Sequence, residues 1–374
     1  MFPFRSLFTT LGALLASFLI CRTPTYEGAA VMVMSNASGL RKHVTFKEIC
    51  SVVDATVQEK EAVDVAQRTP KQIAWNRFKQ NRTGVIAGII SIGFILAAYA
   101  APLIVQIFKV GPYDLYLDQL DPLKANFPIG TAGGISWAHP FGVTPEDGRD
   151  IFANVLFGSR ISFTVAIITT ISSIGLGMLL GITAGYFRGR VDALIGRYSD
   201  FLFAFPSFFM IIALSLPAVE RIQGWGIAQG NNARLLVLIV FLVFFGWPGF
   251  ARLVRSQALS LRERDFVMAA QAQGASNFRI ITKELLPNLW STAIIFLSLA
   301  LPGYLAAEAV FAYLGIGVQP PAISFGLLLD DARKSWSSDP AYLLITSGYL
   351  IAIVLSLNLL GDAIRDAIDP KADR

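Results

Sequence analysis

The chain has 374 residues, of which 54% are hydrophobic and 15% are charged, and its formal net charge is +5. Soluble domains carry about 25% charged residues, so the composition excludes an ordinary soluble protein and indicates a polytopic, all-α membrane protein. The basic residues lie in short loops beside apolar runs rather than in one patch. This distribution argues against nucleic acid as a partner and is typical of charges that orient a chain in a membrane.

The first 68 residues are predicted to be an N-terminal extension. Its apolar segment 7–21 resembles the core of a signal peptide and is short for a membrane span. Three interpretations stay open: an upstream extension from a misassigned start, with Met32 or Met34 as the true one; an interfacial or buried helix; and an extra crossing. Residues 34–67 are polar and lack apolar periodicity, which is typical of a mobile cytoplasmic tail.

Six apolar windows of about 20 residues, the length that crosses a bilayer, follow the extension. They begin near Gly84, Ile161, Phe201, Leu235, Thr292 and Ala341. Loops rich in Arg and Lys alternate with poorer ones, and basic loops stay on the cytoplasmic side. We therefore predict cytoplasmic termini, a first span within 69–108, an extracytoplasmic segment at 109–160 and a core of five spans in 161–374. Four prolines are expected to kink or end these helices: Pro206, Pro217, Pro248 and Pro302.

Sequence signatures of catalysis are missing. His43 and His139 have no partner one helical turn away that would make a zinc site, and the chain has neither a G-x-S-x-G elbow nor a phosphate loop. Cys21 and Cys50 lack metal-ligand spacing, and we predict no disulfide framework. We expect no catalytic residue, cofactor or metal in this chain; if its function is energised by ATP, then ATP and Mg²⁺ would bind to other subunits.

Glu308 is the clear ionisable residue inside a predicted span, in its outer half. Such residues are costly in a membrane and are functional suspects by default. One interpretation is a polar contact that lines a pathway. The other is a structural hydrogen bond to a neighbouring helix end or a partner subunit. We favour the second, because a lone carboxylate without an intramembrane Lys, Arg or second acid makes a poor proton relay.

The loop Asp265–Asn288, DFVMAAQAQGASNFRIITKELLPN, is unusual for a connection between two apolar runs. Its first part, 262–273, has good helix propensity, and Gly274 is the natural left-handed stop for such a helix. Ser276 can then cap a second short helix, which is expected to end by Pro287. The loop therefore predicts two short cytoplasmic helices.

Small residues give the first of these helices a face that another backbone can approach closely. Ala270 and Gly274 are one turn apart, and Ala269 is adjacent. The charged residues around this face can pair with a docking partner: Arg262, Arg264, Asp265 and Arg279. A solvated helical hairpin is the alternative, but it gives no reason for so small and apolar a face.

The loop resembles the pattern E-A-A-x3-G-x9-I-x-L-P of ABC importer permeases. The matching residues are Ala269, Ala270, Gly274, Leu286 and Pro287. Met268 replaces the glutamate and Glu284 replaces the isoleucine, so the match is loose at its two ends. These two departures affect the details of the contact with an ATPase that the pattern implies, and not the existence of that contact.

Further stretches resemble the C-type permease of the oligopeptide/dipeptide/nickel group. HPFGVTPEDGRDIFANVLFGSRISF carries the signature Gly148, Arg149 and Asp150, and the resemblance extends over residues 73 to the C-terminus. The other matching segments are 75–88, 185–209, 308–326 and 361–371. We expect a structural or docking role for Arg149, with Asp147 or Asp150 as its partner. Residues 151–159 are expected to lie along the outer membrane surface before the second span.

The resemblance implies the type I ABC importer permease fold with a coupling-helix loop at 252–289, in the bacterial inner membrane. It implies half of a pore for di- or oligopeptides, coupled to ATPases through residues 262–288. The implied partners are a homologous second permease, two ABC ATPases and an extracytoplasmic solute-binding protein. Alternatives are a nickel or other small-solute permease of the same group, an ATP-independent channel or carrier, and a membrane scaffold.

Overall fold

A computed structural model of the chain describes residues 31–35, 41–45, 70–124, 126–130, 132–337 and 339–368. The chain divides into two compact units, Met1–Ile73 and Ala74–Arg374, which are treated separately. In the first unit, β1 (Val31–Ser35) pairs antiparallel with β2 (Arg41–Thr45). The apolar segment 7–21 and both cysteines lie outside the described residues.

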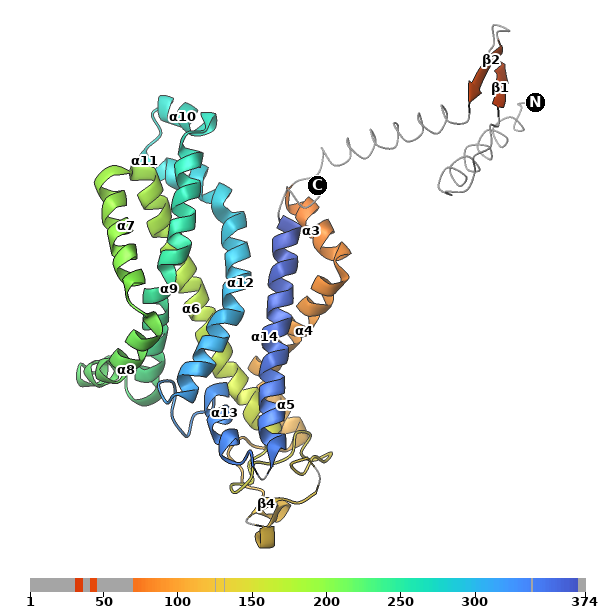
Figure 1. The fold of residues 1–374 in the computed structure, drawn as a ribbon, viewed down its shortest axis with the longest axis vertical. Coiled ribbons are helices and arrows are strands. Elements are labelled where there is room, and N and C mark those ends of the chain that lie inside the picture. The colour runs from red at the N-terminus through yellow and green to blue at the C-terminus, as the bar shows by residue number, and fades with distance from the viewer. Residues whose placement is uncertain are drawn as a thin grey trace. The chain divides into compact units, whose positions relative to one another are not determined.

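From residue 70 onward the described chain is mostly helical (Figure 1). The helices are α3 (Pro70–Gln80), α4 (Arg82–Tyr99), α5 (Ala101–Phe108), α6 (Ile151–Phe187), α7 (Gly189–Ala204), α8 (Ser207–Gly224), α9 (Gly230–Arg262), α10 (Asp265–Ala272), α11 (Asn277–Arg279), α12 (Leu286–Tyr313), α13 (Phe325–Lys334) and α14 (Pro340–Ile368). A π-helical stretch, Ile280–Leu285, joins α11 to α12. Between α5 and α6 lie two 3-10 helices, Leu117–Gln119 and Pro122–Lys124, and the strand pair β3 (Leu120–Asp121) and β4 (Phe127–Pro128).

The helices of the second unit have the length and apolarity of membrane spans. Among the described residues five continuous helical segments meet both conditions, and the number is six if the bent pair α7–α8 is counted as one span. This confirms the prediction of an all-α, polytopic membrane protein, and the predicted six crossings correspond to the higher count. The start of α4 and the end of α14 lie at the same end of the bundle as α10 (Figure 1).

The third predicted span contains a break at the first of the four prolines expected to kink or end helices. Its apolar window begins near Phe201, but α7 ends at Ala204, α8 begins at Ser207, and the two helices meet at 87°. Phe205 has an extended backbone, ψ 136°, because the ring of the following Pro206 disfavours the helical conformation there. Pro206 thus ends a helix as predicted, whereas Pro217, Pro248 and Pro302 lie inside helices.

The prediction that residues 151–159 lie along the membrane surface is wrong. They form the first turns of α6, which continues unbroken for 37 residues. Ile151, Val155 and Ser159 are fully buried, so this segment packs inside the bundle. Asp150 caps the helix. Its carboxylate accepts a hydrogen bond from the N–H of Ala153, which therefore does not depend on the polar membrane surface for a partner.

Three glycines bring α6 and α9 into direct contact. Gly177, Gly181 and Gly185 follow one another at intervals of four, so they share one face of α6. A Cβ added to Gly181 would lie 2.6 Å from the carbonyl oxygen of Ala251, and one added to Gly185 would lie 2.7 Å from the Cβ of Ala258. Small residues at this spacing let two membrane helices approach closely. The α6–α9 pair is the main helix contact of the bundle.

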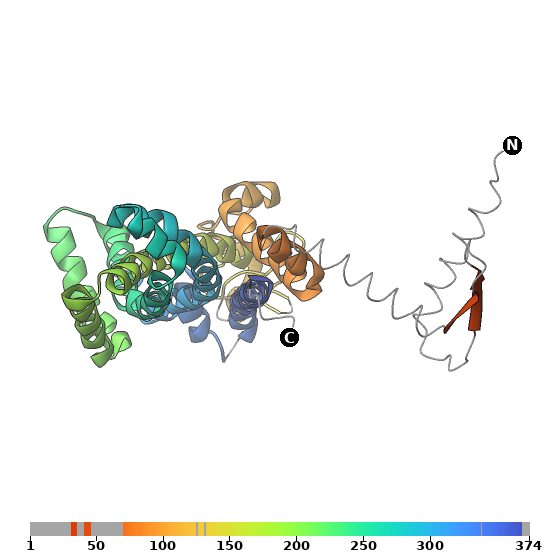
Figure 2. The same ribbon diagram turned by 90° about the horizontal axis from the view of Figure 1, so that it is seen from above.

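Two hydrophobic cores lie at opposite ends of the bundle. One joins the first half of α6 to the end of α12, α13 and α14, and includes Phe163, Leu305 and Tyr342. The other joins the second half of α6 to α9, α10 and the start of α12, and includes Val254 and Val267. Seen along the bundle in Figure 2, α7 and α8 lie at one edge, away from α4 and α14.

Candidate functional site

The first short helix of the loop is shorter than predicted. Helix α9 runs on to Arg262, and the chain then breaks at Glu263 and at the extended Arg264 before α10 begins at Asp265. The expected stop is present: Gly274 has a φ of +79°, in the left-handed region that favours glycine. No atom lies within 4 Å of a Cβ added there, so this position is open.

The second short helix does not end where predicted. The Ser276 hydroxyl accepts a hydrogen bond from the N–H of Arg279 at 3.4 Å, as a helix cap does. The helix, however, passes Pro287 and continues to Tyr313. Just before the proline the winding widens to a π-turn, in which the N–H of Leu286 bonds back to Ile281. Pro287 therefore stands in the first turn of α12, where a missing N–H and a fixed φ are tolerated.

The loop is attached to the end of α6 by specific contacts. The Tyr186 hydroxyl donates to Oδ1 of Asn277 at 2.8 Å, and Nη1 of Arg262 donates to the carbonyl of Tyr186 at 2.5 Å. Arg188 forms an ion pair with Glu263 at 2.5 Å, and this hydrogen bond lowers the pKa of the Glu263 carboxyl. The loop therefore has a fixed position relative to α6.

The inward and outward faces of α10 differ from expectation at one residue. Val267 is fully buried in the core, and Ala270, one turn later, is half-buried against the same core. Ala269 and Gly274 are exposed, as is Ala272. Residues three apart on a helix share a face, so Ala270 lies on the buried face of Val267 and Ala272 lies on the exposed face of Ala269. The bare surface is therefore formed by Ala269, Ala272 and Gly274.

Charged and apolar side chains surround this bare surface. Arg264, Asp265 and Arg279 are exposed, and so is Pro287, while Leu286 is half-buried against the core. Three large apolar side chains are also exposed here, and sequence reasoning missed them: Phe266 at 40%, Met268 at 49% and Phe278 at 77%. The signal was present, since these are large apolar residues in the loop between two apolar spans.

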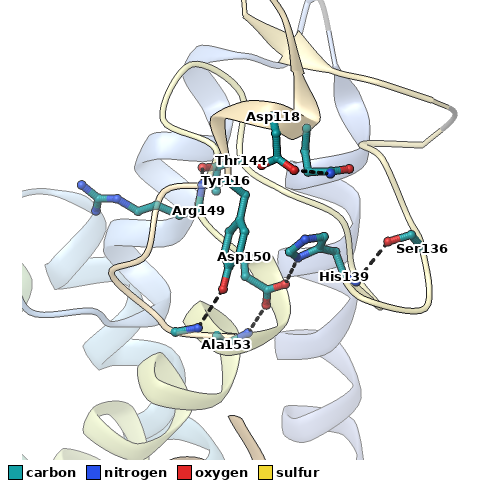
Figure 3. A network of polar contacts seen from close by, with 10 residues as sticks. Tyr116, Asp118, Ser136, His139, Thr144, Arg149, Asp150 and Ala153 are labelled. Carbon is teal, nitrogen blue, oxygen red and sulfur yellow. Dashed lines mark hydrogen bonds and ion pairs between the residues drawn. The ribbon is translucent and has the colours of Figure 1, made fainter. Parts of the chain in front are cut away.

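At the other end of the bundle, Asp150 is fully buried and holds the start of α6 (Figure 3). Its Oδ1 accepts from the N–H of Ala153 at 2.7 Å, and its Oδ2 lies 2.7 Å from Nδ1 of His139. Burial raises the pKa of Asp150, while the hydrogen bonds from Ala153 and His139 act in the opposite direction. The Tyr116 ring meets the His139 ring edge-on, with 4.5 Å between the centroids.

The other two signature residues have separate roles. Gly148 has a φ of +67°, and a Cβ there would lie 3.0 Å from the carbonyl oxygen of Tyr116. Its own carbonyl accepts from the N–H of Tyr116 at 2.8 Å. Arg149 points away from Asp150 (Figure 3), and its guanidinium lies 3.5 Å from Asp147. Of the two expected partners of Arg149, the structure pairs it with Asp147.

Glu308 is fully buried between α6 and the start of α13. Its Oε2 accepts from the Ser162 hydroxyl of α6 at 2.5 Å, and the same hydroxyl oxygen lies 3.5 Å from the N–H of Phe325. This geometry agrees with the structural interpretation of Glu308, a hydrogen bond to a neighbouring helix. The predicted site residues thus fall into three places: the α10 loop, the cap of α6 and the junction of α6, α12 and α13.

Comparison with known proteins gives matches over most of the chain. Residues 177–374 match the family of binding-protein-dependent transport system inner membrane components. Residues 69–128 match the N-terminal transmembrane domain of oligopeptide transport permease C.

Individual proteins of this kind are similar along nearly their whole length. The chain is 34% identical over 310 residues to the glutathione transport system permease protein GsiD of Pectobacterium atrosepticum, covering 82% of this chain and 93% of that protein. It is 34% identical over 303 residues to the dipeptide transport system permease protein DppC of Alkalihalophilus pseudofirmus, covering 81% and 90%. It is 31% identical over 295 residues to the oligopeptide transport system permease protein OppC of Bacillus subtilis, covering 79% and 88%.

Proposed function

This chain belongs to the family of binding-protein-dependent transport system inner membrane components, and from that membership we propose that it is the C-type permease subunit of an ATP-binding-cassette importer for peptides. Its relatives are named for glutathione, dipeptides and oligopeptides, whose shared chemistry is a short peptide. The chain forms half of the pore, and a homologous second permease forms the other half.

The observation that carries this proposal is the exposed surface of the α10 loop. Ala269, Ala272 and Gly274 leave room for a partner's backbone, and Phe278 offers an anchor that the fold itself does not use. This surface fits a groove on an ATPase subunit. Because Tyr186 binds Asn277 and Arg262, a movement of the loop passes directly to α6.

The orientation of the chain in the membrane follows from the same proposal. ATPases bind on the cytoplasmic side, so the α10 end is cytoplasmic, as are the start of α4 and the end of α14. The loop before α6 then faces outward, where the solute-binding protein delivers its ligand. ATP binding draws the α10 loops together and moves the bundle between inward-open and outward-open arrangements.

The substitution Gly274→Arg tests the coupling. The variant is reconstituted with the second permease, both ATPases and the binding protein, and ATP-dependent uptake of a labelled dipeptide is measured together with ATP hydrolysis. We expect the wild-type amount of chain in the membrane but no uptake, because a long charged side chain holds the two surfaces apart. A Gly274→Arg complex that hydrolyses ATP in step with transport contradicts the proposal.

Gly226→Arg is the matched control. Gly226 also has a positive φ, +70°, and no atom lies within 4 Å of its added Cβ. It precedes α9, at the end of the bundle away from α10 (Figure 1). The backbone strain is therefore similar in the two variants, and only Gly274→Arg is expected to abolish coupling.

A further inference from the structure

A groove of about 340 Å³ opens between α7 and α9, with Ala184 of α6 at its floor. It lies toward the α10 end, since α7 begins directly after the Arg188 that pairs with Glu263. Five of its lining side chains are charged: Asp192, Arg197, Asp200, Arg252 and Arg255. Its remaining walls are mainly small, including Gly196, Ser199 and Ala251.

The charges form two ion pairs of different character. Arg255 binds both carboxylate oxygens of Asp192, through Nε and, at 2.7 Å, through Nη2. This two-point pair is partly covered, with side-chain exposures of 39% and 19%. Arg252 meets Asp200 through one contact of 2.8 Å, and these side chains are 57% and 72% exposed. The first pair is fixed by its geometry, whereas the second is open to exchange, because an exposed single contact is worth only about 0–1 kcal/mol.

The charges of the groove lie near the ends of apolar windows, since Asp192, Arg197 and Asp200 precede the window that begins near Phe201. Charged side chains avoid acyl chains, because such exposure is costly, so we expect the groove to meet water rather than lipid. Asp192, Gly196 and Ser199 recur at helical intervals, so one side of α7 lines the groove. Among the described residues α7 packs mainly on α6 and α9, and the groove stays accessible, since the side chains of Arg252 and Asp200 are exposed.

The groove suits a ligand with opposite charges and variable side chains. Its volume is near the lower end of the range for small-molecule pockets, about 300–1,000 Å³. Its small walls impose little selection on side chains, while the mixed charges select the ends of a zwitterion. We infer that this groove is a transient binding site for the termini of a peptide leaving the pore, with Arg197 and Arg252 binding the carboxylate and Asp200 the ammonium group.

Exchange of partners makes such binding reversible. When Arg252 leaves Asp200 for the peptide carboxylate, the peptide ammonium replaces it at Asp200, so no charge is left unpaired. The ring of Phe203, 4.7 Å from the Arg252 guanidinium, holds that side chain near the groove throughout. Transport requires sites that bind strongly enough to admit the solute and weakly enough to release it.

A binding experiment without the solute-binding protein tests this site directly. The permease–ATPase complex in nanodiscs, free of nucleotide, is titrated with a fluorinated dialanine, and broadening of the ligand's NMR signal is measured. We expect saturable binding that Arg252→Gln weakens about five- to tenfold, since one charge-assisted hydrogen bond is lost at an exposed position. Arg252→Lys retains the charge and is expected to keep most of the affinity, which separates loss of the site from misfolding.

Arg190→Gln is the control, because Arg190 lies exposed on the same helix but does not line the groove. Equal affinity of the wild type and Arg252→Gln overturns the inference. The inference is also overturned if the wild type binds the N-acetylated dialanine amide, which carries no terminal charge, with the same affinity as the uncapped dialanine.

The inference rests on the proposed function, and the two fail in different ways. If the complete wild-type system imports no peptide, the proposed function is wrong. If it imports peptide while Arg252→Gln binds and transports as the wild type does, only the assignment of the groove is wrong.

Discussion

Asp150 and Gly274 lie near opposite ends of α6, and their surroundings differ. Around Asp150 the polar groups meet one another: His139, Ala153 and the carboxylate are buried within hydrogen-bonding distance. Around Gly274 the loop is attached to the end of α6 through Asn277, Arg262 and Glu263, and its outer surface is left open. The Asp150 end is thus completed by its own chain, whereas the α10 end keeps open the surface that we propose for an ATPase subunit. We therefore expect residues of the first kind to affect stability and residues of the second kind to affect coupling.

Substitution in the α6–α9 contact is expected to abolish this difference, because both ends depend on it. In Gly181→Leu the new Cβ would meet the carbonyl of Ala251 at 2.6 Å and the Cβ of Val254 at 2.7 Å. Overpacking of this kind costs about 1–3 kcal/mol, and backbone contact places this case at about 3 kcal/mol. We expect most of the chain to be lost from the membrane, measured by fluorescence-detected gel filtration of a tagged protein. Gly175→Leu, on the same helix with no atom within 4 Å, is expected to retain its yield; equal loss in both variants contradicts the role of the contact.

The substitution Asp150→Ala is expected to weaken the outer end alone. Loss of a helix cap costs about 1–2 kcal/mol, and His139 is left without its buried partner. Hydrogen exchange should accelerate in residues 139–153 and remain unchanged in residues 265–280. Asp147→Ala, which removes only the exposed contact to Arg149, is expected to cost less than about 0.5 kcal/mol. Faster exchange at both ends in Asp150→Ala would show that the ends do not differ as described.

The substitution Phe278→Ala should have the smallest effect on stability and a clear effect on transport. Its side chain is 77% exposed, so the free energy of unfolding should change by no more than about 0.5 kcal/mol. Uptake per ATP hydrolysed is expected to fall, because the ATPase loses an aromatic anchor. Leu123→Ala, at the outer end and 96% exposed, serves as the control and is expected to transport normally. If Phe278→Ala transports as much peptide per ATP hydrolysed as the wild type, Phe278 is not part of the docking surface.

Hydropathy and local backbone chemistry were sufficient for part of this description. Apolar windows of span length predicted the number of crossings, because a bilayer leaves a chain few alternatives to the helix. The left-handed Gly274 and the capping Ser276 were also foreseen, since both conformations are set by the residue itself and its immediate neighbours.

Where a helix begins, the angle at which it bends and which distant residues it contacts were not predictable in this way. A hydropathy window reports composition rather than continuity, so it began the second span near Ile161, although α6 begins at Ile151. The break at Pro206 was expected from the proline, but the 87° angle between α7 and α8 was not. The contact of His139 with Asp150 joins residues 11 apart in an irregular loop, where no periodicity relates them. Ala270 was assigned to the outer face because its partner in the core, the π-helical turn at 280–285, had no sequence signature.

The length of α6 has a mechanical consequence. With 37 residues it extends about 55 Å, nearly twice the hydrocarbon thickness of a bilayer, without an interruption at which it could bend independently. A tilt of about 5° about one end displaces the other end by about 5 Å, roughly the rise of one helical turn. A rigid tilt of α6 that moves Asp150 would therefore also move Tyr186, whereas a local loss of the Asp150 cap would not. In the importer that we propose, thermodynamic linkage would make such an influence reciprocal: a ligand-loaded protein docked outside would alter the affinity for nucleotide inside by the same factor by which nucleotide alters that docking.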